Sequence, residues 1–162
     1  MLSRPGAKEI ACRAPIDQTV ASTEEAMQIT VRVSNAGSVH SLEIDTNGRR
    51  QSIAIPAKNT GLGSNVNGGE LLFAALATCF CNDLYREAAK RCIAVQGVDV
   101  EVTGTFGGPG EPARDVSYRV RVHSDATRPA IEELVRATDE IAEIHNTLRS
   151  GCAVRLIQSE NS

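Results

Sequence analysis

The fold of this chain is decided by residues 67–81, which read NGGELLFAALATCFC. Asn67 and Glu70 have the spacing of a capping box, in which each side chain accepts a hydrogen bond from the other residue's backbone, so a helix should begin here. Residues 71–81 place apolar side chains on every face, which predicts that this half of the helix is buried all round. The following residues are amphipathic and extend the helix to about Arg91.

Strand patterns flank this helix on both sides. Alternating apolar and polar residues predict three strands before it and two after it, and Asn47-Gly48 suits a tight turn between the second and the third. A second helix should start at Thr127, with Pro129 in its first turn, and a last strand should close the chain. The order βββ-α-ββ-α-β predicts an α+β fold. The expected strands are residues 28–34, 39–45, 52–55, 98–103, 116–123 and 152–157.

Length and composition narrow the classes of function. The 162 residues suit one domain of ordinary size, with an irregular arm at residues 1–26. A net charge of −3 and an aromatic content of 3% provide neither a basic surface nor a stacking platform, so we expect no nucleic acid or membrane partner. The longest apolar run, residues 71–81, is shorter than a membrane span, and the amino end lacks the apolar stretch of a signal peptide. We therefore expect a cytoplasmic protein.

The cysteines are the candidate chemical groups. The chain has five, an odd number, which argues against a framework of disulfides. Cys79 lies in the apolar helix and is either a core thiol or a reactive one, and reactivity requires a nearby cation, a helix amino end or a metal. Cys81 points about 200° away from Cys79 around the same helix, so an intact helix cannot hold a disulfide between them. The three histidines lack ligand spacing, so we expect no metal site, although a metal bound by Cys79 and Cys81 is a third hypothesis.

Two segments resemble the OsmC/Ohr family of thiol peroxidases: residues 63–80, GSNVNGGELLFAALATCF, and residues 144–149, IHNTLR. The resemblance covers about residues 27–158, the core of a single OsmC-like domain spanning residues 1–162. It implies an intertwined homodimer in which the long central helices are wrapped by antiparallel sheets from both chains. Such an arrangement would explain a helix that has no polar face.

The resemblance also implies a chemistry. The peroxidatic cysteine of the family falls on Cys79, whose sulfur would attack an organic hydroperoxide, release an alcohol and become a sulfenic acid. Glu70 lies one residue after the position of the catalytic glutamate in the hydroperoxide-resistance branch and matches other branches better. We expect it either to cap the helix or to orient a cation beside the thiol.

The second cysteine of the family is missing here, because its position holds Ala142. Reduction of the sulfenic acid would then need an external thiol, Cys152 or Cys81. His145 lies beside that position and would either lower the thiol pKa as an imidazolium or interact with a helix end.

The sequence as a whole favours a thiol-dependent peroxidase that would act as an antioxidant in the oxidative stress response. It would reduce organic hydroperoxides to alcohols with a low-molecular-weight or dithiol-protein reductant and without a cofactor. An apolar pocket of Leu72, Phe73, Leu76 and Phe80 would favour apolar peroxides. The alternative is a catalytically weak OsmC-like protein that binds an apolar ligand or senses oxidative stress through Cys79.

Overall fold

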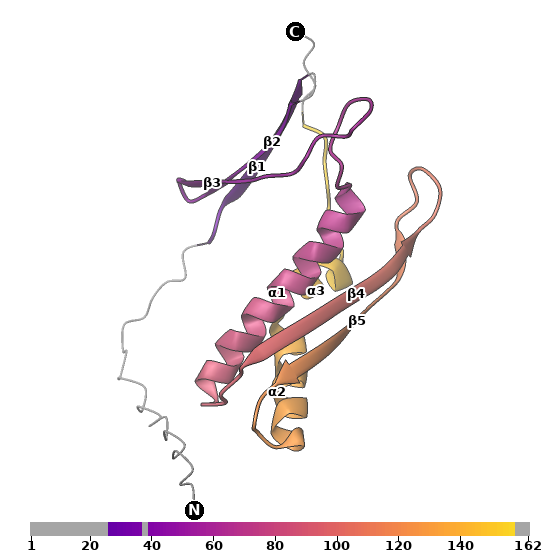
Figure 1. The fold of residues 1–162 in the computed structure, drawn as a ribbon. Helices are drawn as coiled ribbons and strands as arrows, with labels where there is room; N and C mark the ends of the chain where they lie inside the picture. The colour runs from indigo at the N-terminus through magenta and orange to yellow at the C-terminus, as the bar shows by residue number, and fades with distance from the viewer. Residues whose placement is uncertain (1–25, 37–38, 158–162) are drawn as a thin grey trace, which may run out of the picture. The chain divides into compact units, whose positions relative to one another are not determined.

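The computed structural model describes residues 26–36 and 39–157 of the chain. The chain divides into two compact units, residues 1–63 and 64–162, and each is described by itself. The expected arm at residues 1–26 lies outside the described residues except for residue 26. The single-domain organisation stays a prediction. The elements shown in Figure 1 are β1 (Ile29–Ala36), β2 (Val39–Thr46), β3 (Arg49–Ile53), α1 (Gly68–Lys90), β4 (Gly97–Phe106), β5 (Ala113–His123), α2 (Arg128–Ile141) and α3 (Glu143–Ser150).

The first unit holds an antiparallel sheet in the order β1-β2-β3. Asn47 and Gly48 both have positive φ, 48° and 85°, as a tight turn of the primed type requires, which confirms the predicted turn. Because this turn brings Thr46 directly opposite Arg49, pairing begins at the first residue after the turn. The third strand therefore runs over Arg49–Ile53, earlier than the predicted 52–55.

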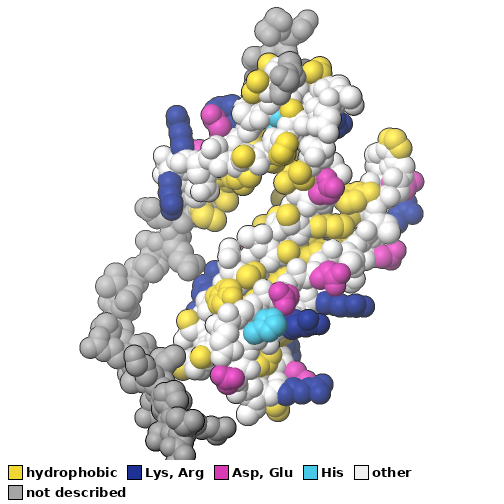
Figure 2. Space-filling view, in the orientation of Figure 1, with side chains coloured by type: hydrophobic (Ala, Val, Ile, Leu, Met, Phe, Trp, Pro, Cys, Tyr) yellow, Lys and Arg dark blue, Asp and Glu magenta, His cyan; other side chains and the backbone are white. Residues whose placement is uncertain are grey.

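The second unit is built around α1, which contacts β4, α2 and α3. β4 and β5 form an antiparallel hairpin with a register shift between Thr103 and Thr105. Phe80 and Leu84 of α1 and Leu134 of α2 are fully buried, and valines of the hairpin pack against them. Figure 2 shows apolar side chains gathered over α1 and the hairpin. These contacts bury the middle of α1 in the core of the unit.

The start of α1 confirms the capping box. The Glu70 N–H donates to Asn67 Oδ1 at 3.0 Å, and the Asn67 N–H donates to Glu70 Oε2 at 2.6 Å. The first half of the helix is not buried all round, however, because Leu71 is 37% exposed and Ala74 and Ala75 are also exposed. The described residues of this chain leave that face uncovered, which is why the prediction of complete burial is wrong for a single chain.

The carboxyl-terminal part differs from the prediction in two ways. Instead of one helix there are two, because Ala142 adopts an extended ψ of 106° between α2 and α3. Residues 152–157 form no strand in the described part of the chain, so this expectation is wrong. Val154, Leu156 and Ile157 are 86–95% exposed, and a strand forms only where a neighbouring strand takes up its hydrogen bonds. The α+β class and the order of the other elements are confirmed, and no helix in the described ranges is both long and apolar enough to cross a bilayer.

Candidate functional site

Cys79 faces two carboxylates. Its Sγ lies 3.4 Å from Oδ2 of Asp83, one turn further along α1, and 3.8 Å from Oε2 of Glu143, the first residue of α3. Cys79 is a free, partly buried thiol, whereas Asp83 is only 3% exposed. The thiol can therefore donate its proton to a buried carboxylate.

Arg86, which is about half exposed, forms ion pairs with the same two carboxylates. Its Nη2 lies 3.0 Å from Asp83 Oδ1 and 3.3 Å from Glu143 Oε1. Each carboxylate thus offers one oxygen to the arginine and the other to the sulfur. Cys79, Asp83, Arg86 and Glu143 are called the thiol cluster below.

The sequence reasoning placed Cys79 but missed the other members of the cluster. Asp83 and Arg86 follow Cys79 by four and seven residues, the spacing of one helix face, so this part was visible in the sequence. Glu143 comes from another helix, and only the break at Ala142 turns the start of α3 toward the thiol. No local pattern carried that information.

The electrostatics of the cluster keep Cys79 protonated. Burial raises the pKa of the Cys79 thiol, and the charges of Asp83 and Glu143 raise it further, although the backbone N–H of Ile144 opposes them. Burial also raises the pKa of Asp83, helped by Glu143 and opposed by Arg86. A hydrogen bond from its own backbone N–H lowers the pKa of Glu143, and Arg86 lowers it further. The resting sulfur is therefore a thiol beside two carboxyl groups whose pKa values shift in opposite directions, upward for Asp83 and downward for Glu143.

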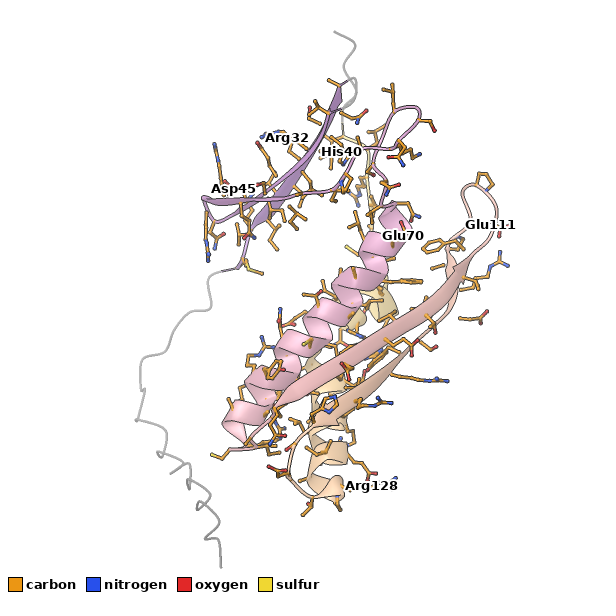
Figure 3. All side chains as sticks on the ribbon, viewed as in Figure 1. Arg32, His40, Asp45, Glu70, Glu111 and Arg128 are labelled. Atoms are coloured by element: carbon orange, nitrogen blue, oxygen red, sulfur yellow. The ribbon has the colours of Figure 1, made fainter. Side chains whose placement is uncertain are left out.

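Glu70 lies at the amino end of α1, as Figure 3 shows, where it accepts the Asn67 backbone N–H. It precedes Cys79 by nine residues, which corresponds to about 13 Å along the helix axis. Within one chain the structure does not bring the two side chains together. The capping role of Glu70 is confirmed, and its catalytic role stays a prediction.

His145 is buried among aromatic rings. Its ring centroid lies 4.8 Å from that of Tyr118 and 5.7 Å from that of Phe80, and the side chain is 5% exposed. Burial lowers the pKa of His145, and the charge of Arg149 lowers it further. The imidazole is therefore neutral near pH 7, which does not favour the predicted role as an imidazolium beside the thiol.

Cys81 and Cys152 are both free thiols. Cys81 is partly buried on α1, and Cys152 is exposed just after α3. Neither is bonded to Cys79, so a resolving role for either stays a prediction.

An apolar cavity of about 590 Å³ opens between α1, the β4–β5 hairpin and α3. Three of the four residues expected in a pocket, Leu72, Phe73 and Leu76, line it. Phe80 does not, because it is fully buried in the core. The polar and charged residues of the lining are Asp115, Tyr118, His145 and Arg149. The α1 residues of the lining lie on the turns that precede Cys79, which is not itself a lining residue.

The thiol cluster also holds a possible set of metal ligands, since donor atoms of Cys79, Asp83 and Glu143 lie within 4.8 Å of one another. This set differs from the hypothetical pair of Cys79 and Cys81. Arg86 already provides a positive charge to both carboxylates, so a divalent cation is not needed to compensate them.

A family model and several solved structures that are similar to this chain are described as OsmC-like. The family model described as OsmC-like protein matches residues 61–157. The fold is similar to that of an OsmC-like protein from Mycoplasma pneumoniae, with 19% identity, a TM-score of 0.58 and coverage of 78% of this chain and 89% of that chain. It is also similar to that of a hypothetical protein from Aquifex aeolicus, with 16% identity, a TM-score of 0.56 and coverage of 78% of this chain and 89% of that chain. An OsmC-like hydroperoxide resistance protein from Jannaschia sp. has 16% identity and a TM-score of 0.50, with coverage of 84% of this chain and 95% of that chain. No curated protein matches the chain.

Proposed function

The chain belongs to the OsmC-like protein family, and we propose that it is a thiol-dependent peroxidase that reduces organic hydroperoxides at Cys79. The observation that carries the proposal is a free thiol whose Sγ lies 3.4 Å from a buried carboxylate, on a helix that also lines an apolar cavity. A thiol, a proton acceptor and an apolar binding surface are the parts that this reaction needs.

The first half of the reaction would oxidise Cys79. The sulfur attacks the outer oxygen of the hydroperoxide, the O–O bond breaks, and the products are an alcohol and a sulfenic acid. Ala142 stands where the family's second cysteine would be, and it has no thiol with which to resolve this intermediate. An external thiol would reduce it directly, or after a disulfide to Cys79 has formed from Cys152, or from Cys81 once α1 has rearranged locally.

The cavity supports organic hydroperoxides over hydrogen peroxide. Its walls are largely the aliphatic and aromatic side chains of α1 and the hairpin. Burying an alkyl group there would contribute roughly 25 cal/mol for each Å² of apolar surface removed from water, so about 100 Å² would contribute about 2.5 kcal/mol. Hydrogen peroxide has no such group.

A homodimer is part of the proposal. Apolar residues that the sequence pattern places on buried faces are exposed in a single chain, and a second copy would cover them. They lie on β1, at the start of α1 and in the segment after α3: Ile29, Val31, Val33, Leu71, Val154, Leu156 and Ile157. A dimer of this kind agrees with the intertwined arrangement that the resemblance implies.

One observation favours the alternative function of a sensor or binding protein. Thiols that react quickly usually have a lowered pKa, whereas burial and two carboxylates raise the pKa of Cys79. A slow thiol would suit a stress sensor or a ligand-binding protein better than an efficient peroxidase.

Peroxide consumption under turnover conditions distinguishes the two functions. The protein is mixed with cumene hydroperoxide and an excess of dithiothreitol, and the remaining peroxide is measured over time. A peroxidase consumes many equivalents of peroxide, and Cys79→Ser abolishes consumption whereas Cys81→Ser retains it. Consumption of no more than one equivalent by the wild type would reject turnover and favour the alternative.

A further inference from the structure

The state of Cys79 poses a problem for the proposed peroxidase. A thiolate attacks peroxides far better than a thiol, yet the surroundings of Cys79 favour the thiol. Among the described residues, the side chains that contact Sγ are those of Asp83 and Glu143, and both are acidic. A reaction at neutral pH then requires a group that removes the proton as the sulfur attacks.

Asp83 has the geometry of that group. Its Oδ2 lies 3.4 Å from Sγ, which is within hydrogen-bond reach for a sulfur donor, and the side chain is 3% exposed. Glu143 is the weaker candidate, because its Oε2 lies 3.8 Å from Sγ and its side chain is 64% exposed. The charged groups that face the Cys79–Asp83 pair are Arg86, from the next turn of α1, and Glu143, from α3.

We propose that Asp83 is a catalytic residue that accepts the thiol proton of Cys79 during attack on the peroxide, and that Arg86 is a positioning residue that holds Asp83 in place. This inference rests on the proposed peroxidase function. It assigns a role to Asp83 that neither the resemblance nor the comparisons contain.

The S–H proton moves to Asp83 Oδ2 while a bond forms between Sγ and the outer oxygen of the hydroperoxide. The O–O bond breaks, and its electron pair leaves with the inner oxygen as an alkoxide. The alkoxide takes up a proton, from Asp83 directly or through water, and departs as the alcohol. The sulfur is oxidised by two electrons, the peroxide is reduced by two, and Asp83 returns to its ionised form.

Arg86 fixes the direction of this transfer. Its Nη2 donates to Asp83 Oδ1 at 3.0 Å, which leaves Oδ2 as the oxygen that faces the sulfur. Arg86 also lowers the pKa of Asp83, against the larger upward effect of burial and the upward effect of Glu143, and so favours the ionised form that can accept a proton. Because Arg86 is about half exposed, it can hold this position without the cost of a buried cation.

The pH profile of the wild-type protein tests the proposal without any variant. Formation of the Cys79 sulfenic acid by cumene hydroperoxide is followed in a single turnover between about pH 6 and pH 8.5. A base-assisted thiol reacts at a constant rate wherever Asp83 is ionised and Cys79 is protonated, so the proposal predicts a plateau in this range. A rate that rises about tenfold for each pH unit would show that only the free thiolate reacts, and would overturn the role of Asp83.

Asp83→Asn provides a second test, because two electrophiles respond to it in opposite directions. Iodoacetamide needs the thiolate and releases iodide without a proton, so removing the negative charge beside Sγ should speed alkylation severalfold at pH 7. Peroxide needs the proton acceptor, so the same variant should slow sulfenic acid formation by about tenfold or more. Asp83→Glu, which retains a carboxylate, should recover part of the peroxide rate. If both reactions became faster in Asp83→Asn, Asp83 would be only a source of charge.

Asp99→Asn is the matched control for Asp83→Asn. Asp99→Asn removes an exposed carboxylate of β4 that contacts His123, and it should change neither rate. Failure of the proposed function appears as a wild-type protein that reacts with iodoacetamide but forms no sulfenic acid with peroxide at any pH. Failure of this inference alone appears as a sulfenic acid that forms at a rate following the thiolate.

Discussion

At the scale of single residues, Cys79 shows how burial and charge oppose reactivity. Burial alone raises the thiol pKa, and the two carboxylates that approach Sγ from α1 and α3 add to the effect. The backbone N–H of Ile144 works in the other direction but does not reverse the shift. The reactivity of the thiol is therefore set by the cluster and responds to each of its members.

Removing the charge of Glu143 should increase the reactivity of Cys79. In Glu143→Gln one like charge near Sγ disappears, so the thiolate becomes easier to form and the thiol pKa falls. We expect the pH midpoint of iodoacetamide alkylation to move to lower pH, and alkylation at pH 7 to become severalfold faster. Glu133→Gln, which removes a carboxylate paired with Arg136 on α2, is the matched control and should leave the midpoint unchanged. An unchanged midpoint in Glu143→Gln would contradict the electrostatic account of the cluster.

Sequence reasoning identified Cys79 because an apolar helix and a family-like segment both point to it. It could also have identified Asp83 and Arg86, which share a helix face with Cys79 at intervals of four and three residues. It could not have identified Glu143, because the contact depends on how α3 packs against α1. A residue that reaches the site through tertiary packing leaves no periodic signal.

At the scale of elements, the capping box is the clearest link between sequence and structure. Asn67 and Glu70 exchange hydrogen bonds at the start of α1, as their spacing predicts. The elements that were predicted less well depend on longer-range pairing: the tight turn sets where β3 begins, and the extended ψ of Ala142 divides α2 from α3. The last predicted strand has no neighbour within the described residues, so its alternating pattern alone does not produce one.

Asn67→Ala should destabilise the helix start without changing the chemistry. The variant loses the acceptor for the Glu70 N–H, which costs about 1 kcal/mol of unfolding free energy. We expect a fall in Tm of about 2–4 °C and an unchanged rate of Cys79 oxidation. Glu70→Gln keeps an acceptor for the Asn67 N–H and should remain near wild-type stability, so a loss of oxidation rate in this variant would reveal the predicted catalytic role of Glu70. A variant Asn67→Ala as stable as the wild type would show that the capping box contributes nothing.

At the largest scale, many large apolar side chains of the described residues are exposed. Val154 and Ile157 are each 95% exposed, and Val31 and Val33 of β1 are more than half exposed although their alternation is that of a buried sheet face. A monomeric protein rarely leaves so many large apolar residues in water. The proposed homodimer would cover these residues.

Charged residues in the segment after α3 should therefore weaken the dimer. We expect the wild-type chain to sediment as a dimer at micromolar concentration, and Val154→Glu combined with Leu156→Glu to shift it toward the monomer. Arg155→Glu, between these two positions, changes charge without removing an apolar side chain and serves as the control. Sedimentation velocity measures the outcome, and a wild-type protein that sediments as a monomer would contradict the proposed assembly.

Cys79 is the sulfur that we propose to react with organic hydroperoxides. The most direct test of this role is the intact mass of the protein after addition of one equivalent of cumene hydroperoxide in the presence of a sulfenic-acid trap. The account predicts one trap adduct on the wild type and on Cys81→Ser, none on Cys79→Ser, and slower labelling with hydrogen peroxide. An adduct that persists in Cys79→Ser, or a wild-type protein that acquires none, would contradict it.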